Sequence, residues 1–189
     1  MNQPEIESTI IHDGWLHNAR KLPSPNQDER PNGEISLLVI HCISLPPGEF
    51  GTENIDRLFC NRLTPEGHPY FCTIADLKVS AHLLINREGS MTQYVPFHRR
   101  AWHAGISIFD GRGRCNDFSI GIELEGTETV PYTEAQYRCL TDVTRILLRH
   151  YPQLTRQRIV GHCDIAPGRK TDPGESFDWS LYHDLLTGR

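Results

Sequence analysis

The sequence lacks the features that mark several special classes of protein. Its 189 residues contain no run of Lys and Arg of the kind that binds nucleic acid or an anionic membrane, and the net charge of −5 disfavours a partner made of phosphates. No apolar stretch approaches the roughly 18 residues that a membrane-spanning helix needs. Internal repeats and low-complexity tracts are absent as well. We therefore expect no nucleic-acid partner, no membrane, and one monomeric domain over residues 1–189.

An export signal and a disulfide framework are also missing. The first ten residues, MNQPEIESTI, have neither a basic region nor an apolar core, so we expect no signal peptide. Six cysteines in a chain without an export signal are typical of reduced thiols. The expected location is therefore the cytoplasm.

The expected elements alternate between strands and helices. Apolar or alternating runs predict strands over residues 35–42 and 119–125, a hairpin over 79–95 that turns at Gly89, and a short strand over 158–162. Helical spacing predicts a short helix capped by Thr52, a long helix over 133–150 behind a capping box, and a closing helix over 177–186. This order predicts an α/β fold, a single domain with a central mixed β-sheet flanked by helices.

Two stretches are expected to be irregular. Residues 1–34 form an extended N-terminal segment, and its part from 17 to 34 is rich in Pro, Asn and charge, which is typical of a surface loop. Residues 98–118 are polar and carry no clear period. A structureless stretch of that length inside a compact domain usually serves function, so we expect an active-site loop there.

Two histidines stand at the ends of expected apolar strands. His41 lies at the C-terminal end of the strand over 35–42, and His162 ends the strand over 158–162. A single histidine in such a place is ordinarily a packed or surface residue, but ligand sites in open α/β sheets lie off strand ends. Two imidazoles and a carboxylate with one open position make the usual catalytic zinc site. The helical motif H-E-x-x-H of metalloproteases is absent.

The third ligand is left open by spacing alone. Cys163, Asp164 and Asp172 all lie near His162 in sequence. If residues 162–164 are extended, Cys163 points away from His162 and is disfavoured, whereas Asp164 shares its face. Asp172 can also return to the metal across the loop that Pro167-Gly168 would turn.

Other candidate residues have an ordinary structural interpretation beside the functional one. Glu123 and Glu125 share one face of the strand over 119–125, which is either a solvated face or the source of a general base. Nothing local distinguishes His82 or His103 from packed histidines. Cys42 and Cys163 each follow a histidine, but neighbours along a strand point apart, which disfavours a thiol hydrolase.

Five motifs together resemble a known family. They are LLVIHCISLPPGEFG (37–51), VSAHLLINREG (79–89), RAWHAG (100–105), CNDFSIGIELEG (115–126) and GHCDIAPGRKTDPG (161–174). In this order they resemble the zinc N-acetylmuramoyl-L-alanine amidases, in particular the cytosolic branch that acts on 1,6-anhydro muropeptides. The resemblance extends from about Gly14 to Trp179, nearly the whole chain.

The resemblance implies a set of site residues. The zinc ligands fall on His41, His162 and Asp172, and the catalytic residues on Glu123 and Lys170. Tyr70 falls on an aromatic position near the site, and Cys42 stands where close relatives often have Asn. The implied cofactor is Zn²⁺. The implied reaction is hydrolysis of the amide between (1,6-anhydro-)N-acetylmuramic acid and L-alanine of a muropeptide, in cell-wall recycling.

Two further expectations concern the substrate and the alternatives. Trp102 and Arg114 are expected to line the substrate site, and the arginine would be a bidentate partner for stem-peptide carboxylates. The alternative is a non-catalytic peptidoglycan-binding module on the same fold, and a further one is a zinc deacetylase. Such binding modules can lack a zinc ligand, whereas all the implied ligand and catalytic positions are occupied here, which favours an enzyme.

Overall fold

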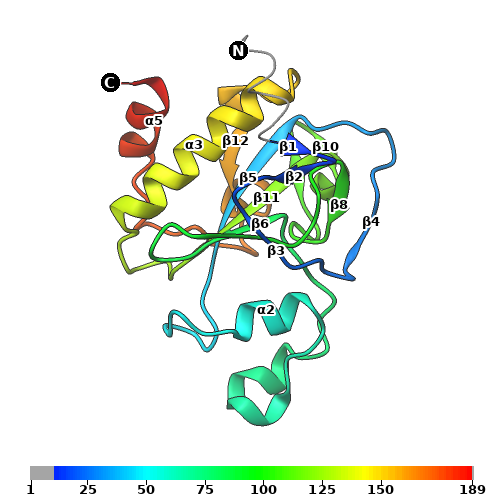
Figure 1. Ribbon diagram of the computed structural model, residues 1–189, viewed down its shortest axis with the longest axis vertical. Coiled ribbons are helices and arrows are strands. Elements are labelled where there is room, and N and C mark those ends of the chain that lie inside the picture. The colour runs from blue at the N-terminus through cyan, green and yellow to red at the C-terminus, as the bar shows by residue number, and fades with distance from the viewer. Residues whose placement is uncertain (1–10, 189) are drawn as a thin grey trace.

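The computed structural model describes residues 11–188, and a six-stranded mixed β-sheet lies at its centre (Figure 1). The strands, in their order across the sheet, are β12 (Ile159–Gly161), β5 (Leu37–Ile43), β11 (Ser119–Glu125), β6 (Leu83–Ile85), β7 (Met91–Gln93) and β3 (Arg20–Lys21). The first four are mutually parallel, β7 is antiparallel to β6, and β3 is parallel to β7. The predicted mixed sheet is confirmed.

The central strands agree with the sequence pattern. The apolar run of β5 is buried on both faces over its first five residues, as expected for a strand inside a parallel sheet. Strand β11 has the expected bounds, and all seven of its residues are buried. Strands β6 and β7 form the expected hairpin, and Gly89 in its turn has a φ of +80°, which favours glycine.

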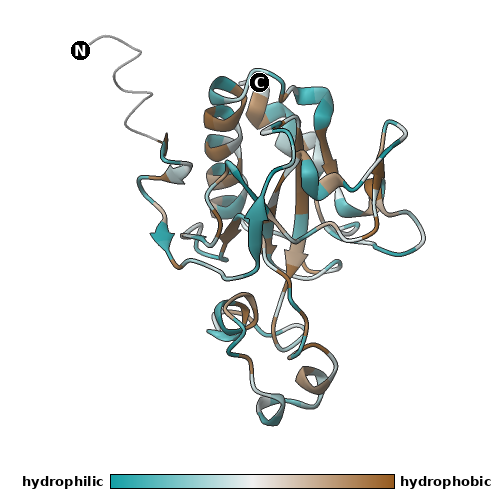
Figure 2. Cartoon of the chain, turned by 90° about the vertical axis from the view of Figure 1, so that its right-hand side faces the viewer, coloured by the Kyte–Doolittle hydropathy of each residue, from teal (hydrophilic) through white to brown (hydrophobic). Residues whose placement is uncertain are grey.

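Two helices cover one face of this sheet. Helix α3 (Glu134–His150) begins at the predicted capping box, in which Gln136 N donates to Thr133 Oγ1 at 3.1 Å and Thr133 N donates to Gln136 Oε1 at 3.1 Å. Helix α5 (Trp179–Thr187) packs beside it and is capped by Asp178. Their apolar side chains bury the even-numbered residues of β5 and β11. In Figure 2 the helices alternate between apolar and polar colours, as amphipathic helices do.

A smaller lobe, which follows β5 in the chain, projects beyond the ends of the central strands in Figures 1 and 2. It contains helix α2 (Asn54–Phe59) and two 3₁₀ turns, η1 (Pro65–Gly67) and η2 (Pro69–Thr73). The predicted cap at Thr52 is wrong, because the N-cap is Glu53 and the Thr52 hydroxyl donates instead to the Leu45 carbonyl. Apolar residues of α2 pack with Tyr94 and neighbouring residues in a second core cluster.

The other face of the sheet is covered by short elements and loops. They are β8 (Arg99–Ala101), β9 (Ile108–Phe109), β10 (Arg112–Gly113), the 3₁₀ turn η3 (Cys115–Asp117) and helix α4 (His162–Ile165). The stretch over 98–118 therefore contains short strands, β8 paired with β4 (Gln27–Glu29) and β9 with β10. The 3₁₀ turn η4 (Arg156–Arg158) precedes β12. Among the described helices, none is long and apolar enough to cross a membrane.

The N-terminal segment is more closely packed than a surface loop. Within its described part it forms β1 (Ile11–His12), β2 (Trp15–Leu16), β3 and β4. The side chain of Arg30 is buried and donates hydrogen bonds to the carbonyls of Phe97, Asn116 and Ser119. The expectation of a surface loop over 17–34 is therefore wrong around Arg30. Residues 1–10 of the expected extended segment lie outside the described residues.

Candidate metal centre

Two histidines and an aspartate converge at the carboxyl ends of β5 and β12. These strands are parallel neighbours in which Gly161 pairs with Ile40, so the residues that follow, His162 and His41, lie side by side. His41 Nδ1 is 3.0 Å from His162 Nδ1 and 3.0 Å from Asp172 Oδ2, and His162 Nδ1 is 3.1 Å from Asp172 Oδ2. Ligand atoms of a tetrahedral zinc ion with bonds of about 2.0–2.1 Å lie roughly 3.3 Å apart. The triangle therefore has the size that one metal ion requires.

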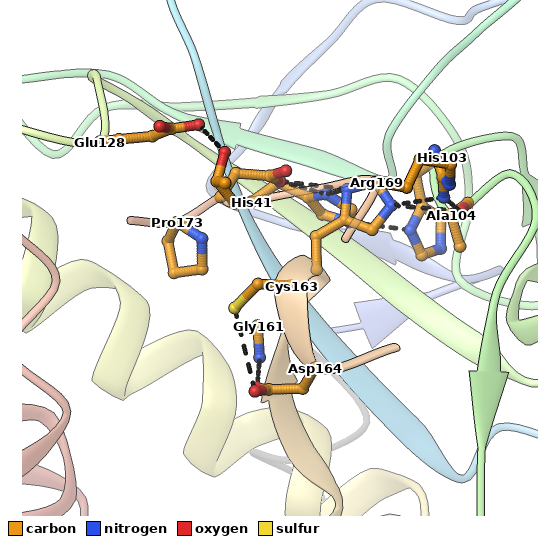
Figure 3. Close-up of polar contacts among 12 residues, drawn as sticks. His41, His103, Ala104, Glu128, Gly161, Cys163, Asp164, Arg169 and Pro173 are labelled. Atoms are coloured by element: carbon orange, nitrogen blue, oxygen red, sulfur yellow. Dashed lines mark hydrogen bonds and ion pairs between the residues drawn. The ribbon is translucent and has the colours of Figure 1, made fainter. Parts of the chain in front are cut away.

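The loop after β12 decides which acidic residue reaches this triangle. Residues 162–165 form the helical turn α4, so the expectation of an extended 162–164 segment is wrong. Its physical reason is a local hydrogen bond, because Asp164 Oδ2 accepts from Gly161 N at 2.7 Å (Figure 3). The Asp164 carboxylate is therefore engaged by Gly161 N. The chain turns at Gly168, whose φ is +75°, and brings Asp172 back to His162. Cys163 N donates to Asp172 O at 3.0 Å and ties the two ends of the loop together.

The hydrogen bonds around the triangle place the histidine protons on the outer nitrogens, so the atoms that face one another carry lone pairs. The Nε2–H of His162 donates to Ala104 O at 3.1 Å, so in the neutral ring Nδ1 carries a lone pair. Nε2 of His41 is likewise engaged, 2.9 Å from His103 Nδ1. Two nitrogen lone pairs and the Asp172 carboxylate then face one another, an arrangement that a cation between them stabilises. Two imidazoles and one carboxylate are a donor set that suits Zn²⁺.

Burial sets the protonation of these groups. It lowers the pKa of His41 to about 4, although the hydrogen bond to Asp172 acts in the opposite direction. Burial by itself would raise the pKa of Asp172, but the interaction with His162 and His41 outweighs it and holds that pKa below its ordinary value. Neutral imidazole and ionised carboxylate are the forms that bind a metal.

Glu123 lies beside the triangle because of strand register. It pairs with His41 across β11 and β5, and both side chains point to the face opposite the helices. Its Oε2 atom is buried and has no hydrogen-bond partner among residues 11–188. Burial and the nearby Asp172 raise the pKa of Glu123 well above its ordinary value, with Lys170 acting in the opposite direction. Glu123 is thus a buried carboxyl with one oxygen available to exchange a proton.

Glu125, two residues further, is a structural residue. Its Oε1 accepts from Gly51 N at 2.6 Å and its Oε2 from Arg87 N at 3.2 Å. It is 2% exposed, so the alternative interpretation of this face as solvated is wrong for both glutamates. The carboxylate of Glu125 connects β11 to two loops and has no free oxygen.

A cavity of about 320 Å³ opens over the triangle. Glu123, Lys170, Tyr70 and Trp102 line it together with the three converging residues. Tyr70 and Lys170 are exposed and Trp102 is half-buried, so these side chains are accessible to a ligand from solvent. Arg114 does not line this cavity. It is exposed, with a φ of +62°, and its Nε lies 3.1 Å from Asp117 Oδ2.

Cys42 also lines the cavity, directly after His41. Burial raises the pKa of its thiol to about 12. At neutral pH it is therefore protonated and a poor nucleophile, which further disfavours a thiol hydrolase. All six cysteines have free thiols.

The sequence patterns gave His103 no role, yet the fold brings it into contact with His41. Nothing in its local spacing could indicate this, because the contact joins positions 62 residues apart. The only signal was its place in the RAWHAG motif. His82, the other histidine without a local signal, is a packed residue, and its Nδ1 accepts from Gly121 N at 3.1 Å.

Comparison with protein families shows one match that covers most of the chain. The family described as N-acetylmuramoyl-L-alanine amidase matches residues 31–175, a range that contains every residue of the candidate site.

Individual proteins of known sequence or structure are also similar. The 1,6-anhydro-N-acetylmuramyl-L-alanine amidase AmpD of Citrobacter freundii is 58% identical over 179 residues, which cover 94% of this chain and 95% of that protein. A crystal structure of a selenomethionine AmpD derivative, 58% identical, superposes with a TM-score of 0.91 over 93% of this chain and 98% of the other. The E. coli amidase AmiD, solved with the substrate anhydro-N-acetylmuramic acid-L-Ala-D-γ-Glu-L-Lys, is 27% identical, with a TM-score of 0.59 over 94% of this chain and 66% of the other.

Proposed function

The chain belongs to the N-acetylmuramoyl-L-alanine amidase family, and from this premise we propose that it hydrolyses the amide between 1,6-anhydro-N-acetylmuramic acid and L-alanine of a muropeptide. The activity for which relatives such as the C. freundii enzyme are named supports this substrate, since that enzyme is 58% identical over nearly the full length of both chains. The reaction removes the stem peptide from fragments of the cell wall and belongs to their recycling. The protein is an enzyme, an amide hydrolase.

The observation that carries the proposal is the buried Glu123 carboxyl, whose Oε2 has no hydrogen-bond partner in the described part of the chain, beside the triangle of His41, His162 and Asp172. These three residues would hold a zinc ion through Nδ1, Nδ1 and Oδ2. Zinc, when bound, would act as a Lewis acid on a carbonyl oxygen and would lower the pKa of a bound water to about 7.

Glu123 would be the general base and then the general acid. Its carboxylate, which lines the cavity, accepts the proton of the attacking water and passes it to the leaving amine of L-alanine. Removing such a proton-transfer group typically costs about 10²- to 10⁴-fold in rate. Burial supports this role, since it raises the pKa of the carboxyl and so favours uptake of a proton.

Lys170 would stabilise the negative charge that develops on the carbonyl oxygen. It lines the cavity and is close enough that its charge acts on both Glu123 and His41. One such donor contributes roughly 10²- to 10³-fold to the rate in other hydrolases.

The remaining side chains would contact the substrate. Tyr70 and Trp102 offer aromatic surface at the cavity, which suits apolar contact with the bicyclic sugar. Arg114 lies outside the cavity lining, so a contact with a stem-peptide carboxylate would require the peptide to extend beyond the cavity.

The enzyme would act in the cytoplasm on soluble muropeptides rather than on the wall polymer. Six free thiols are typical of a reducing compartment. The chain also has no basic run to hold an anionic polymer. The monomeric state stays a prediction from the sequence.

Product analysis of an anhydro-muropeptide by mass spectrometry tests the proposal. We expect a free peptide that begins with L-alanine and the free anhydro sugar, no product after a zinc chelator, and recovery when zinc is restored. Release of acetate would instead indicate a deacetylase, and binding without any product would indicate a non-catalytic peptidoglycan-binding module. Equal kcat/KM for anhydro and reducing-end muropeptides would remove the recycling assignment while leaving the amidase intact.

A further inference from the structure

Two consecutive residues, His103 and Ala104, contact the outer nitrogens of both candidate histidine ligands. His103 Nδ1 lies 2.9 Å from His41 Nε2, and Ala104 O accepts from His162 Nε2 at 3.1 Å. Figure 3 shows His41, His103 and Ala104 as neighbours at the site. One short segment, after strand β8, thus contacts the two ligands on the side away from the metal position.

The protons along the first of these contacts can be assigned from the chemistry of ligation. A histidine that binds a metal through Nδ1 carries its proton on Nε2. His41 therefore donates to His103, whose Nδ1 accepts and whose own proton must lie on Nε2. That proton is given to Ser119 Oγ at 3.0 Å. With one tautomer for each ring, every hydrogen bond in the series Ser119–His103–His41 has a donor and an acceptor, and His41 Nδ1 is free for the metal.

The surrounding chain forms a fitted site for the His103 ring. A Cβ atom at Gly121 would lie 2.4 Å from His103 Cγ, so the ring rests against the backbone of β11 where only glycine leaves room. Asn116 Oδ1 accepts from the backbone N–H of His103 at 3.1 Å and of Ala104 at 2.8 Å. Backbone and ring are both held, so the orientation of the ring is defined by several contacts.

We propose that His103 is a positioning residue of the metal centre, which accepts the Nε2 proton of His41 and holds Nδ1 of that ligand toward the metal. The inference rests on the proposed function, in which His41 is a zinc ligand. Outer partners of this kind fix the tautomer and the orientation of a ligand, and their loss typically lowers metal affinity by roughly 10- to 100-fold.

Two variants separate the hydrogen bond from the packing. His103→Leu fills a similar volume but has no acceptor, whereas His103→Asn is smaller and places an amide oxygen close to the position of Nδ1. Zinc affinity of the metal-free protein is measured by competition with a chromophoric chelator, and folding is checked by circular dichroism and thermal unfolding. We expect a loss of about 10- to 100-fold for His103→Leu and a smaller loss for His103→Asn.

The matched control is Tyr182→Phe. It removes a buried hydrogen bond of 2.7 Å to Thr144, between α5 and α3, and should leave zinc affinity unchanged. The inference is overturned if His103→Leu binds zinc as tightly as His103→Asn or as the wild type, since volume and not the acceptor would then matter. It is also overturned if Tyr182→Phe weakens zinc binding as much.

A milder variant covers the case in which His103→Leu does not fold. Ser119→Ala removes the hydroxyl that accepts the Nε2 proton of His103. It should weaken zinc binding measurably, but by less than about tenfold. An unchanged affinity there would contradict the inference. A wild-type protein that binds no zinc would contradict the proposed function and this inference with it, whereas wild-type binding that is unaltered in the His103 and Ser119 variants contradicts this inference alone.

Discussion

The two faces of the central sheet are built from alternate residues of the same strands, but they are covered in different ways. On the face covered by α3 and α5, strand β11 presents Ile120, Ile122 and Leu124. On the other face the same strand presents Ser119, Gly121, Glu123 and Glu125, which loops and short elements cover. Both sets are buried, so burial alone does not separate core from site.

The difference lies in what each buried side chain needs. An apolar side chain is stabilised by any close-packed neighbour, whereas a buried polar group requires a defined hydrogen-bond partner or a charge. On the loop-covered face, Glu125 has two such partners, whereas the buried Oε2 of Glu123 has none among residues 11–188. Substitutions on the helix-covered face should therefore change stability alone, whereas the loop-covered face also carries the groups for metal binding and rate.

The largest effect is expected from removal of a ligand on the loop-covered face. His162→Ala should lose its zinc and with it the activity, because two remaining ligands do not hold the ion. The control is Asp164→Ala, two residues away, which loses the contacts to Gly161 N and Cys163 Sγ and should keep zinc and activity. Metal analysis of both purified variants decides this. Full zinc occupancy in His162→Ala would move the metal site elsewhere.

The next effect separates the two glutamates of β11. Glu123→Gln keeps the shape of the side chain but cannot take up a proton, so kcat should fall by about 10²- to 10⁴-fold with zinc retained. Steady-state kinetics with metal analysis measures this.

Glu125→Gln is the matched change and should act on stability instead. One backbone N–H loses its acceptor, which costs about 1–3 kcal/mol, while kcat per folded molecule stays near that of the wild type. An inactive Glu125→Gln with an active Glu123→Gln would mean that the roles of the two residues are exchanged.

The effect on the helix-covered face, next to Glu123 in the sequence, concerns stability and not the rate. Ile122→Ala removes a fully buried side chain from the main core and should lower the free energy of unfolding by about 2–5 kcal/mol. That corresponds to roughly 2–4 °C in Tm per kcal/mol for a chain of this size. Zinc content and kcat of the folded protein should not change. A large loss of kcat at unchanged Tm would show that the two faces are not independent.

The smallest effect concerns the start of α3. Thr133→Ala removes the capping hydroxyl and should lower the free energy of unfolding by about 0.5–2 kcal/mol, whereas Thr133→Ser retains the cap. Urea unfolding of the two variants measures the difference. Equal stability of both variants would show that the cap contributes nothing here.

The regular part of the fold could be predicted because local patterns determine it. The alternation of β11 and the capping box of α3 are local signals, and both elements have the expected positions. The Thr52 cap could not be judged locally, because its hydroxyl is taken by Leu45 O. The burial of Arg30 depends on carbonyls that lie 67 to 89 residues away.

The candidate site was predictable where strand ends define it. His41 and His162 follow from two apolar strands with a histidine near the carboxyl end, but the carboxylate could be chosen only through family resemblance. The structure supplies a physical reason for this choice. In the turn α4 the side chain of Asp164 accepts from Gly161 N, whereas Asp172 Oδ2 lies next to His162 Nδ1. The contacts of Glu125 and His103 were not predictable, because their partners lie far away in the sequence.

Anomalous X-ray scattering at the zinc absorption edge tests the central claim most directly. In crystals of the active protein, the account predicts one peak per chain, bonded to Nδ1 of His41, Nδ1 of His162 and Oδ2 of Asp172, with zinc–nitrogen distances of about 2.0–2.1 Å. A peak bonded to Cys42 Sγ or to His103, or active crystals without a zinc peak at this triangle, would contradict it.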